Sequence, residues 1–321
     1  MRLGKFEIES PLILGPMAGV TDQAFRTVCA ELGANVTVTE MVSSRALVYK
    51  DKKSAALLKK TDVGICGAQI FGNDPDIMAQ GAQLALEISG CDFLDINMGC
   101  PMPKIANSGD GCGLMRTPEL AERIVKAVCK AVDVPVTIKC RLGWDKGNIN
   151  VLDFTKRMED AGAAMITVHG RTRSQLYSGT ADWDTIAKVK QNLSVPLIAN
   201  GDIVDAGSAL RCKKWTGADG LMIGRATFGD PWVFEQVSAA LAGKPIPERP
   251  CLADRVDVAL RQFEMAREDK GEHIACLEAR KHFAWYLRGV SHSSYYKTQI
   301  SAISSMEDIY RIGEGIKRDL T

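Results

Sequence analysis

The sequence predicts an α/β fold, a (β/α)8 TIM barrel followed by a small C-terminal helical domain. Three observations support this prediction. Short β-branched apolar runs recur along the first three quarters of the chain, segments with helical spacing of apolar residues separate them, and only helical patterns follow a proline-rich segment. Apolar runs that alternate with helices are typical of parallel strands covered on both faces.

Eight runs are the candidate barrel strands, spaced by about 25 to 40 residues as repeated βα units require. They are PLILGP (11–16), NVTVTE (35–40), GICGAQI (64–70), FLDIN (93–97), PVTIKC (135–140), MITVHG (165–170), PLIAN (196–200) and GLMIG (220–224). The helices between them have recognisable starts. Thr21 is a candidate N-cap, and Thr117 followed by Pro118 opens another helix.

The connection after the fourth strand is unusual. Residues 98–116, MGCPMPKIANSGDGCGLMR, are longer and richer in glycine than a barrel loop requires. We expect a catalytic loop that acts as a lid over the active site. It carries two thiols, Cys100 and Cys112, and a mobile lid would allow them to form a disulfide on oxidation.

The strand pattern ends near residue 243. The segment AGKPIPERP (242–250) has three prolines and no period, so it is interpreted as a linker. Helical patterns follow at 251–269, 273–289 and 305–320. We therefore assign residues 1–243 to the barrel and residues 244–321 to a helical domain.

Composition narrows the function classes. The 321 residues have a net charge of +1, four histidines and ten cysteines without a C-x-x-C pair. Cysteines and histidines with metal-ligand spacing are therefore missing from the sequence, as is an apolar run of membrane-spanning length. We expect a cytoplasmic monomer that binds no metal and no membrane.

The ends of the candidate strands are unusually polar, and barrel active sites lie where the strands end. The residues at these ends are Pro16, Met17, Ala18, Glu40, Gln69, Asn97, Cys100, Lys139, Arg141, His169, Arg171, Asn200, Gly201, Asp202, Gly224 and Arg225. At strands seven and eight, NGDI (200–203) and GRA (224–226) match a phosphate cradle, because glycines let backbone N–H groups approach an anion and an arginine adds positive charge.

Lys139 lies inside an otherwise apolar strand, where an unpaired ammonium group is costly. Three interpretations remain open. It forms a Schiff base, as in barrel aldolases, it stabilises negative charge on a reduced flavin, or it pairs with Asp95 or Glu40. His169, at a strand end beside Arg171, is expected to contact cofactor or substrate.

With these positions assembled, the sequence resembles the dihydrouridine synthases, flavin enzymes that reduce uridines in transfer RNA, and is most similar to their bacterial B-type branch. The motifs that carry the resemblance are PLILGPMAGVTDQAFR, GAQIFGNDP, DINMGCPMPKI, KCRLGWD, ITVHGRTRSQLYSG, IANGDI, GADGLMIGRATFGDPWVF and EARKHFAWYLRG. They extend through most of the chain.

The resemblance implies FMN as cofactor, NADPH as reductant and tRNA as substrate. It places Pro16, Met17, Ala18, Gln69, Lys139 and His169 near the flavin ring, and Asn200, Gly201, Asp202, Gly224 and Arg225 at its phosphate. It also implies that Asn97 binds uracil, that Arg171 meets substrate or flavin phosphate, and that Cys100 donates a proton to C5 after a hydride reaches C6. A thiol with an ordinary pKa of about 8.5 is mostly protonated at neutral pH, which suits an acid.

The tail stretch ARKHFAWYLRGVSHSSYYKT mixes basic and aromatic residues without an acid. This composition is typical of RNA-binding surfaces, and Arg280, Lys281 and Arg288 are the candidate contacts. The alternative is that its aromatic residues form the core of the helical domain.

Two alternatives to the tRNA enzyme remain beside the aldolase. One is an FMN barrel reductase of a free pyrimidine or another small conjugated substrate. The other is an RNA-binding protein without catalysis.

Overall fold

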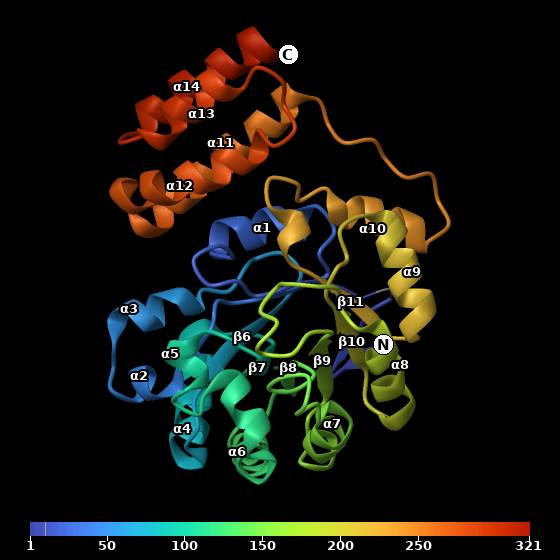
Figure 1. Cartoon of the computed structure of the whole chain (residues 1–321). Coiled ribbons are helices and arrows are strands. Elements are labelled where there is room, and N and C mark those ends of the chain that lie inside the picture. The colour runs from blue at the N-terminus through green and yellow to red at the C-terminus, as the bar shows by residue number, and fades with distance from the viewer. Residues whose placement is uncertain (10) are drawn as a thin grey trace.

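The chain, whose structure is a computed structural model describing residues 1–9 and 11–321, contains a closed barrel of eight parallel strands (Figure 1). They are β3 (Leu12–Leu14), β4 (Val36–Val38), β6 (Ile65–Phe71), β7 (Phe93–Met98), β8 (Val136–Cys140), β9 (Met165–His169), β10 (Leu197–Asn200) and β11 (Gly220–Ile223). Each pairs with its neighbour in order, and β11 pairs with β3 to close the cylinder. The eight expected strands are present, so the predicted TIM barrel is confirmed.

Three two-residue strands are absent from the sequence prediction. β1 (Arg2–Leu3) and β2 (Phe6–Glu7) form an antiparallel hairpin, and β5 (Val42–Ser43) pairs with the end of β6. Such short strands have no detectable period. Leu3 of the hairpin shares a hydrophobic cluster with Met165, the first residue of β9. The hairpin therefore packs at the amino-terminal end of the barrel, away from the strand ends where a site is expected.

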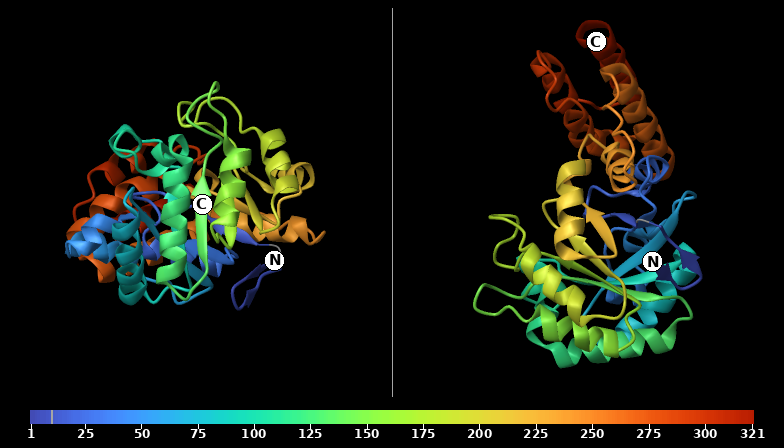
Figure 2. Two further views of the ribbon diagram at one scale, coloured as in Figure 1. Left: turned by 90° about the horizontal axis from the view of Figure 1, so that it is seen from below. Right: turned by 90° about the vertical axis from the view of Figure 1, so that its right-hand side faces the viewer.

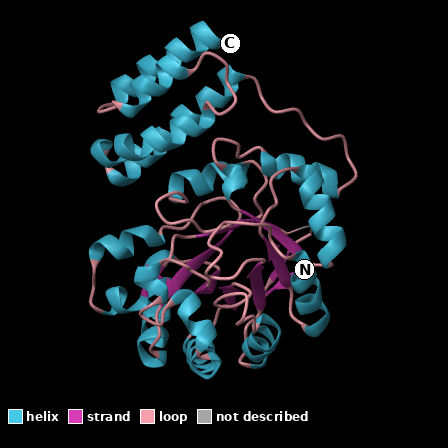
Figure 3. Cartoon of the chain, in the orientation of Figure 1, coloured by secondary structure: helices cyan, strands magenta, loops and turns pink. Residues whose placement is uncertain are grey.

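Helices surround the strands, as Figure 3 shows in cyan around magenta. Around the barrel they are α1 (Gln23–Glu31), α2 (Ser44–Val48), α3 (Lys52–Ala55), α4 (Pro75–Ser89), α5 (Pro103–Ala106), α6 (Pro118–Ala131), α7 (Val151–Asp160), α8 (Trp183–Asn192), α9 (Ala206–Thr216) and α10 (Val233–Leu241). None of the helices in the described part of the chain has the length and apolar character needed to cross a membrane.

The start of α1 differs from the prediction. Asp22, not Thr21, is the N-cap, and its carboxylate accepts a hydrogen bond from the Phe25 N–H at 2.8 Å. The Thr21 hydroxyl instead accepts from the backbone N–H of Met17 at 2.9 Å. It thereby closes the turn that follows β3, so the turn and the helix each have their own side-chain cap.

The loop at 98–116 is not the free lid expected from its composition. It contains α5 and a 3-10 helix, Gly111–Arg116. Cys112, Leu114 and Met115 are buried in the main barrel core. Burial of these apolar side chains holds the second half of the loop in place, because exposing them would cost hydrophobic free energy. Only the first half, around Cys100, remains at the barrel mouth.

The tail consists of α11 (Leu252–Lys270), α12 (Glu272–Tyr286), α13 (Ser294–Ser301) and α14 (Met306–Leu320). The short helix α13 is absent from the sequence prediction. Residues 242–251, between α10 and α11, form neither helix nor strand, and Figure 2 shows the tail projecting from the barrel beyond this segment. A cluster that includes Phe263, Phe283 and Ile309 gives the tail a hydrophobic core of its own.

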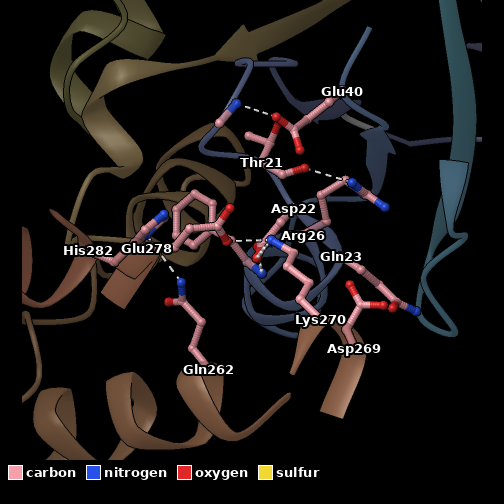
Figure 4. A network of polar contacts seen from close by, with 12 residues as sticks. Thr21, Asp22, Gln23, Arg26, Glu40, Gln262, Asp269, Lys270, Glu278 and His282 are labelled. Carbon is pink, nitrogen blue, oxygen red and sulfur yellow. Dashed lines mark hydrogen bonds and ion pairs between the residues drawn. The ribbon is translucent and has the colours of Figure 1, made fainter. Parts of the chain in front are cut away.

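Polar contacts join the tail to the loop after β3 (Figure 4). The Lys270 ammonium donates to the Asp22 carboxylate at 2.7 Å and also pairs with Glu278. The His282 ring packs edge-on against Phe25, with 5.1 Å between ring centroids. The tail therefore rests on α1 and its N-cap, next to the turn that borders the barrel mouth.

Candidate active site

A cavity of about 830 Å³ opens at the carboxyl ends of the barrel strands. The sequence-predicted residues on its wall are Pro16, Met17, Ala18, Gln69, Asn97, Cys100, Lys139, His169, Asn200, Gly201, Asp202, Gly224, Arg225 and Arg288. Three predicted residues, Arg171, Arg280 and Lys281, are not part of this wall. The strand order brings together side chains that are more than two hundred residues apart in the sequence.

One end of the cavity is suited to an anion. Gly201 has a φ of +116°, and a Cβ there would lie 2.9 Å from the His169 ring. Gly224 faces open space, and within residues 1–9 and 11–321 the backbone N–H groups of Gly224 and Arg225 have no acceptor. The Arg225 side chain is half exposed. Free N–H groups beside a guanidinium group match the donors that a phosphate requires.

The other end is built on a row of buried hydrogen bonds. The Thr137 hydroxyl and the Gln69 amide donate to opposite oxygens of Asp95, at 2.5 and 2.6 Å. The Asn97 amide donates to Gln69 at 2.9 Å, and the Asn97 oxygen accepts from the Cys100 N–H at 2.9 Å. Burial raises the pKa of Asp95. Cys100 is thus held in place from within the barrel.

Lys139 follows the same wall on β8, directly opposite Asn97 of β7. It forms no hydrogen bond or ion pair with any residue that the structure describes, so the expected alternative of pairing with Asp95 or Glu40 is not found. Burial, followed by repulsion from Arg141, lowers the pKa of Lys139 to about 8. The ammonium group is therefore available to a ligand at neutral pH, and an anionic ligand would satisfy it.

The two loop thiols have different surroundings. Cys100 borders the cavity and is 9% exposed, whereas Cys112 is fully buried. Burial raises the pKa of Cys100, and it raises that of Cys112 to about 12. Both thiols are therefore protonated at neutral pH, and only Cys100 can deliver its proton into the cavity.

His169 is a neutral ring on the cavity wall. Burial lowers its pKa, and the nearby positive charges of Lys139 and Arg141 lower it further. Its ring nitrogens form no hydrogen bond within the described residues, so they remain free for a ligand. A neutral imidazole offers one donor and one acceptor.

Arg171 lies behind the cavity wall, and its side chain is 2% exposed. It donates to the carbonyl oxygens of Ser178 and Gly179 and to the Asp202 carboxylate, the last at 2.9 Å. The expectation that Arg171 meets substrate or cofactor directly is therefore replaced by a positioning role. The reason is burial, since its donors are occupied by the loop that precedes α8.

The basic residues of the tail are used in different ways. The Arg280 guanidinium donates twice to the Ile303 carbonyl, at 2.9 and 2.6 Å, and Lys281 donates to the Gly19 carbonyl. Both therefore have partners within the protein. Arg288 is exposed and borders the cavity. Arg288 is the one of the three predicted RNA contacts that faces the mouth.

The aromatic residues of the tail are mainly structural. Phe283 and Tyr286 are fully buried in its core. Trp285 stacks on Phe228 of the barrel with 4.1 Å between ring centroids. Tyr295 is exposed. The expected alternative, in which the aromatic residues form the core, thus holds for most of them.

Two residues of the wall were beyond sequence reasoning. Tyr177 lies on the wall beneath the Arg225 guanidinium, 4.8 Å from the ring centroid, and Arg249 reaches the cavity from the linker. The Arg249 side chain donates to the Gly229 carbonyl at 2.8 Å. The linker has no period that would orient Arg249, and only the motif around Tyr177 singled that residue out.

Comparisons with known proteins agree with this architecture. A family model described as dihydrouridine synthase matches residues 13–318. The chain is 40% identical over 309 residues to tRNA-dihydrouridine synthase B of Pasteurella multocida, covering 96% of this chain and 93% of the relative. The protein of the same name from Vibrio vulnificus is 40% identical over 307 residues, covering 95% of each chain. The solved structure of histamine dehydrogenase from Rhizobium sp. 4-9 shares the fold, with a TM-score of 0.59 and 13% identity over 83% of this chain and 50% of that one.

Proposed function

The chain belongs to the dihydrouridine synthase family, whose members are flavin-dependent oxidoreductases, and on this premise we propose that it reduces uridines in tRNA with FMN as cofactor and NADPH as reductant. One observation carries the proposal. A protonated thiol, Cys100, and a glycine–arginine anion site lie on the wall of a single cavity. A flavin reductase that protonates its substrate requires this combination.

The cavity suits FMN at both ends. Gly201, Gly224 and Arg225 would hold the phosphate, and Gln69 and Lys139 would bond the ring edge. When bound and reduced, FMN supplies the hydride that adds to C6 of uracil. Lys139, which has no protein partner in the described chain, would stabilise the negative charge of the reduced ring, an effect of several kcal/mol in a site that excludes water.

Cys100 would donate its proton to C5 of the uracil ring. Two features support this role. Burial raises the pKa of its thiol, which keeps the proton in place until the ring becomes basic. The backbone bond to Asn97 fixes the start of the loop, so that the thiol stays at the mouth. Solvent then returns a proton to the thiolate.

A uridine inside folded tRNA cannot reach this cavity without leaving its stack. We propose that residues 244–321 bind the tRNA and that Arg288, at the mouth, contacts phosphate beside the flipped base. Arg225 and Arg249 lie on the same wall and would extend this positive surface. Arg280 and Lys281 would support it indirectly, through the tail core and the turn after β3.

The test is anaerobic spectroscopy of the purified full-length protein. Flavin is identified by mass after release, the protein is reduced with NADPH, and reoxidation is followed after adding unmodified tRNA, free uridine or orotate. We expect reoxidation by tRNA alone. Reoxidation by the small molecules but not by tRNA would favour a small-substrate reductase. A protein that neither contains nor takes up FMN would contradict the proposal.

A further inference from the structure

The row of hydrogen bonds beneath the cavity has a defined direction. It runs from Thr137 through Asp95 and Gln69 to Asn97 and ends at the backbone after β7. The three central side chains are almost completely buried, at 4%, 1% and 8% exposed for Asp95, Gln69 and Asn97. Buried amides without water must satisfy their donors and acceptors inside the protein, so their orientation matters.

The backbone fixes this direction at one end. The N–H groups of Gly99 and Cys100 both point at the Asn97 side chain, at 3.1 and 2.9 Å. An N–H group only donates, so the Asn97 oxygen must face them and its NH2 group must face Gln69. The oxygen of Gln69 then accepts this bond, which leaves its own NH2 group toward Asp95.

The carboxylate fixes the same direction at the other end. Asp95 offers acceptors on both oxygens, one to Gln69 and one to Thr137. The two ends agree, so neither amide can turn over without placing two acceptors or two donors against each other. Such a mismatch in a buried site costs about 1 to 3 kcal/mol, which is about five- to 150-fold in an equilibrium.

This direction determines what the amides can offer a ligand. The oxygens of Asn97 and Gln69 are both occupied, and each NH2 group has one hydrogen left. Both residues lie on the cavity wall, and Lys139 lies opposite Asn97. This corner of the cavity therefore presents donors only, and it should bind groups that accept hydrogen bonds.

We propose that Asp95 is a positioning residue that holds Gln69 and Asn97 as hydrogen-bond donors, and that the donor on Asn97 binds the O4 carbonyl of uracil and so excludes cytosine. The inference rests on the proposed function. It adds to that function the residue and the polarity that determine which pyrimidine is accepted, because cytosine has an amino donor where uracil has O4.

Position and chemistry point to O4. Asn97 holds the N–H of Cys100, the residue that would protonate C5, and the carbon that bears O4 is bonded to C5. Negative charge that develops on the ring before protonation is shared between C5 and O4. A fixed N–H donor at O4 would therefore stabilise the transition state as well as select the base. No oxidant or reductant beyond those of the proposed function is needed.

The experiment reverses the row by two substitutions. Asn97→Asp makes position 97 an acceptor toward Gln69, so the Gln69 amide turns and its oxygen meets the Asp95 carboxylate. Asp95→Asn alone keeps the original direction, because the new amide still has an oxygen to accept from Gln69, and it serves as the matched control. In the double variant the amide at position 95 can donate to the turned Gln69, so every bond is again satisfied.

We expect Asn97→Asp to lower the thermal unfolding midpoint and weaken FMN binding by about ten- to 100-fold, and Asp95→Asn to have a small effect. Adding Asp95→Asn to Asn97→Asp should restore about tenfold of the lost FMN affinity and part of the unfolding midpoint. Effects of the two substitutions that simply add in both measurements would overturn the directed row.

Selectivity is measured with two tRNA transcripts that carry uridine or cytidine at the target position. Wild type and Asp95→Asn should reoxidise with the uridine transcript only, and the double variant should lose at least about tenfold of this preference. Recovery of FMN affinity with an unchanged preference would overturn the assignment to O4. If wild-type protein reacts with neither transcript, the proposed function and the O4 assignment both fail, whereas unfolding and FMN binding still judge the row itself.

Discussion

On the barrel side of the cavity, the polar side chains are held from below by neighbouring strands and keep free atoms for a ligand. Lys139 has no partner among the described residues, and Asn97 and Gln69 each keep one N–H. On the tail side, the basic groups are largely spent on the protein itself, as Arg280 is on the Ile303 carbonyl. The barrel thus holds the chemistry ready, while the tail mainly supports the mouth.

This difference explains why a run of charges is weak evidence for a binding surface. A charged group in a strand end of a barrel is constrained to face the mouth. A charged group on a helix surface is free to pair with any nearby carbonyl or carboxylate, as Lys270 does with Asp22. Only contacts in the folded protein separate the two cases.

The largest expected effect concerns the barrel side. Cys100→Ala should slow flavin reoxidation by tRNA by about 10²- to 10⁴-fold, because the ring loses its proton donor. Reduction by NADPH and flavin content should stay near wild type. Cys112→Ala is the matched control on the same loop and should leave reoxidation largely intact. Stopped-flow absorbance measures each half-reaction, and equal losses in both variants would contradict a specific role for Cys100.

Lys139→Met removes the unpaired charge. Loss of one preorganised donor from a closed site costs about 10²-fold in rate. We therefore expect NADPH reduction and reoxidation by tRNA to slow by about this factor, and the flavin reduction potential to become more negative. A wild-type potential would indicate that Lys139 does not face the flavin.

The pH dependence tests the same group with a smaller change. The pKa of Lys139 is lowered to about 8, so its ammonium group is present below this pH and lost above it. Reoxidation by tRNA should therefore decline as the pH rises past about 8, by about tenfold per pH unit at most. In Lys139→Arg this decline should move to the higher pH at which Cys100 loses its proton. An unshifted decline would rule out Lys139 as the titrating group.

On the tail side, Arg288→Ala and Arg280→Ala should separate. Arg288 borders the mouth, so its loss should weaken tRNA binding severalfold and reduce the slope of log affinity against log salt by about 1. Arg280→Ala should instead lower the free energy of unfolding by about 1 to 3 kcal/mol, because the Ile303 carbonyl loses its donors. Filter binding across salt concentrations and urea unfolding measure the two. The reverse result would show that the tail binds RNA through Arg280.

The smallest expected effect lies at the junction of the two regions. Lys270→Met should lower the free energy of unfolding by about 1 to 2 kcal/mol, because Asp22 and Glu278 lose a partly buried partner. Arg318→Met, at the exposed pair with Asp319, is the control and should cost at most about 0.5 kcal/mol. Equal costs would mean that the junction is no stronger than an exposed surface pair.

The sequence predicts the barrel well because its strands are buried on both faces and read as continuous apolar runs. It also predicts most of the cavity wall, since a polar residue at the end of such a run has one place to go. It does not predict that Cys112 joins the core, because glycine-rich composition says little about packing. Nor does it predict Arg249 at the mouth, since a linker without a period leaves side-chain direction open.

The tail shows the limit most clearly. Its helices follow from the spacing of apolar residues, except for the short α13. The use of its charges does not follow, because the partners of Lys281 and Lys270 lie near residues 19 and 22, about 250 residues earlier in the chain.

The most direct test is the mass of the RNA after a single anaerobic turnover. NADPH-reduced protein is mixed with an unmodified tRNA transcript, and the RNA is digested and analysed by mass spectrometry. We predict a gain of two hydrogens at a defined uridine, in step with flavin reoxidation, and no gain with Cys100→Ala on the same time scale. Flavin reoxidation without any change in the mass of the RNA would contradict the proposed reaction.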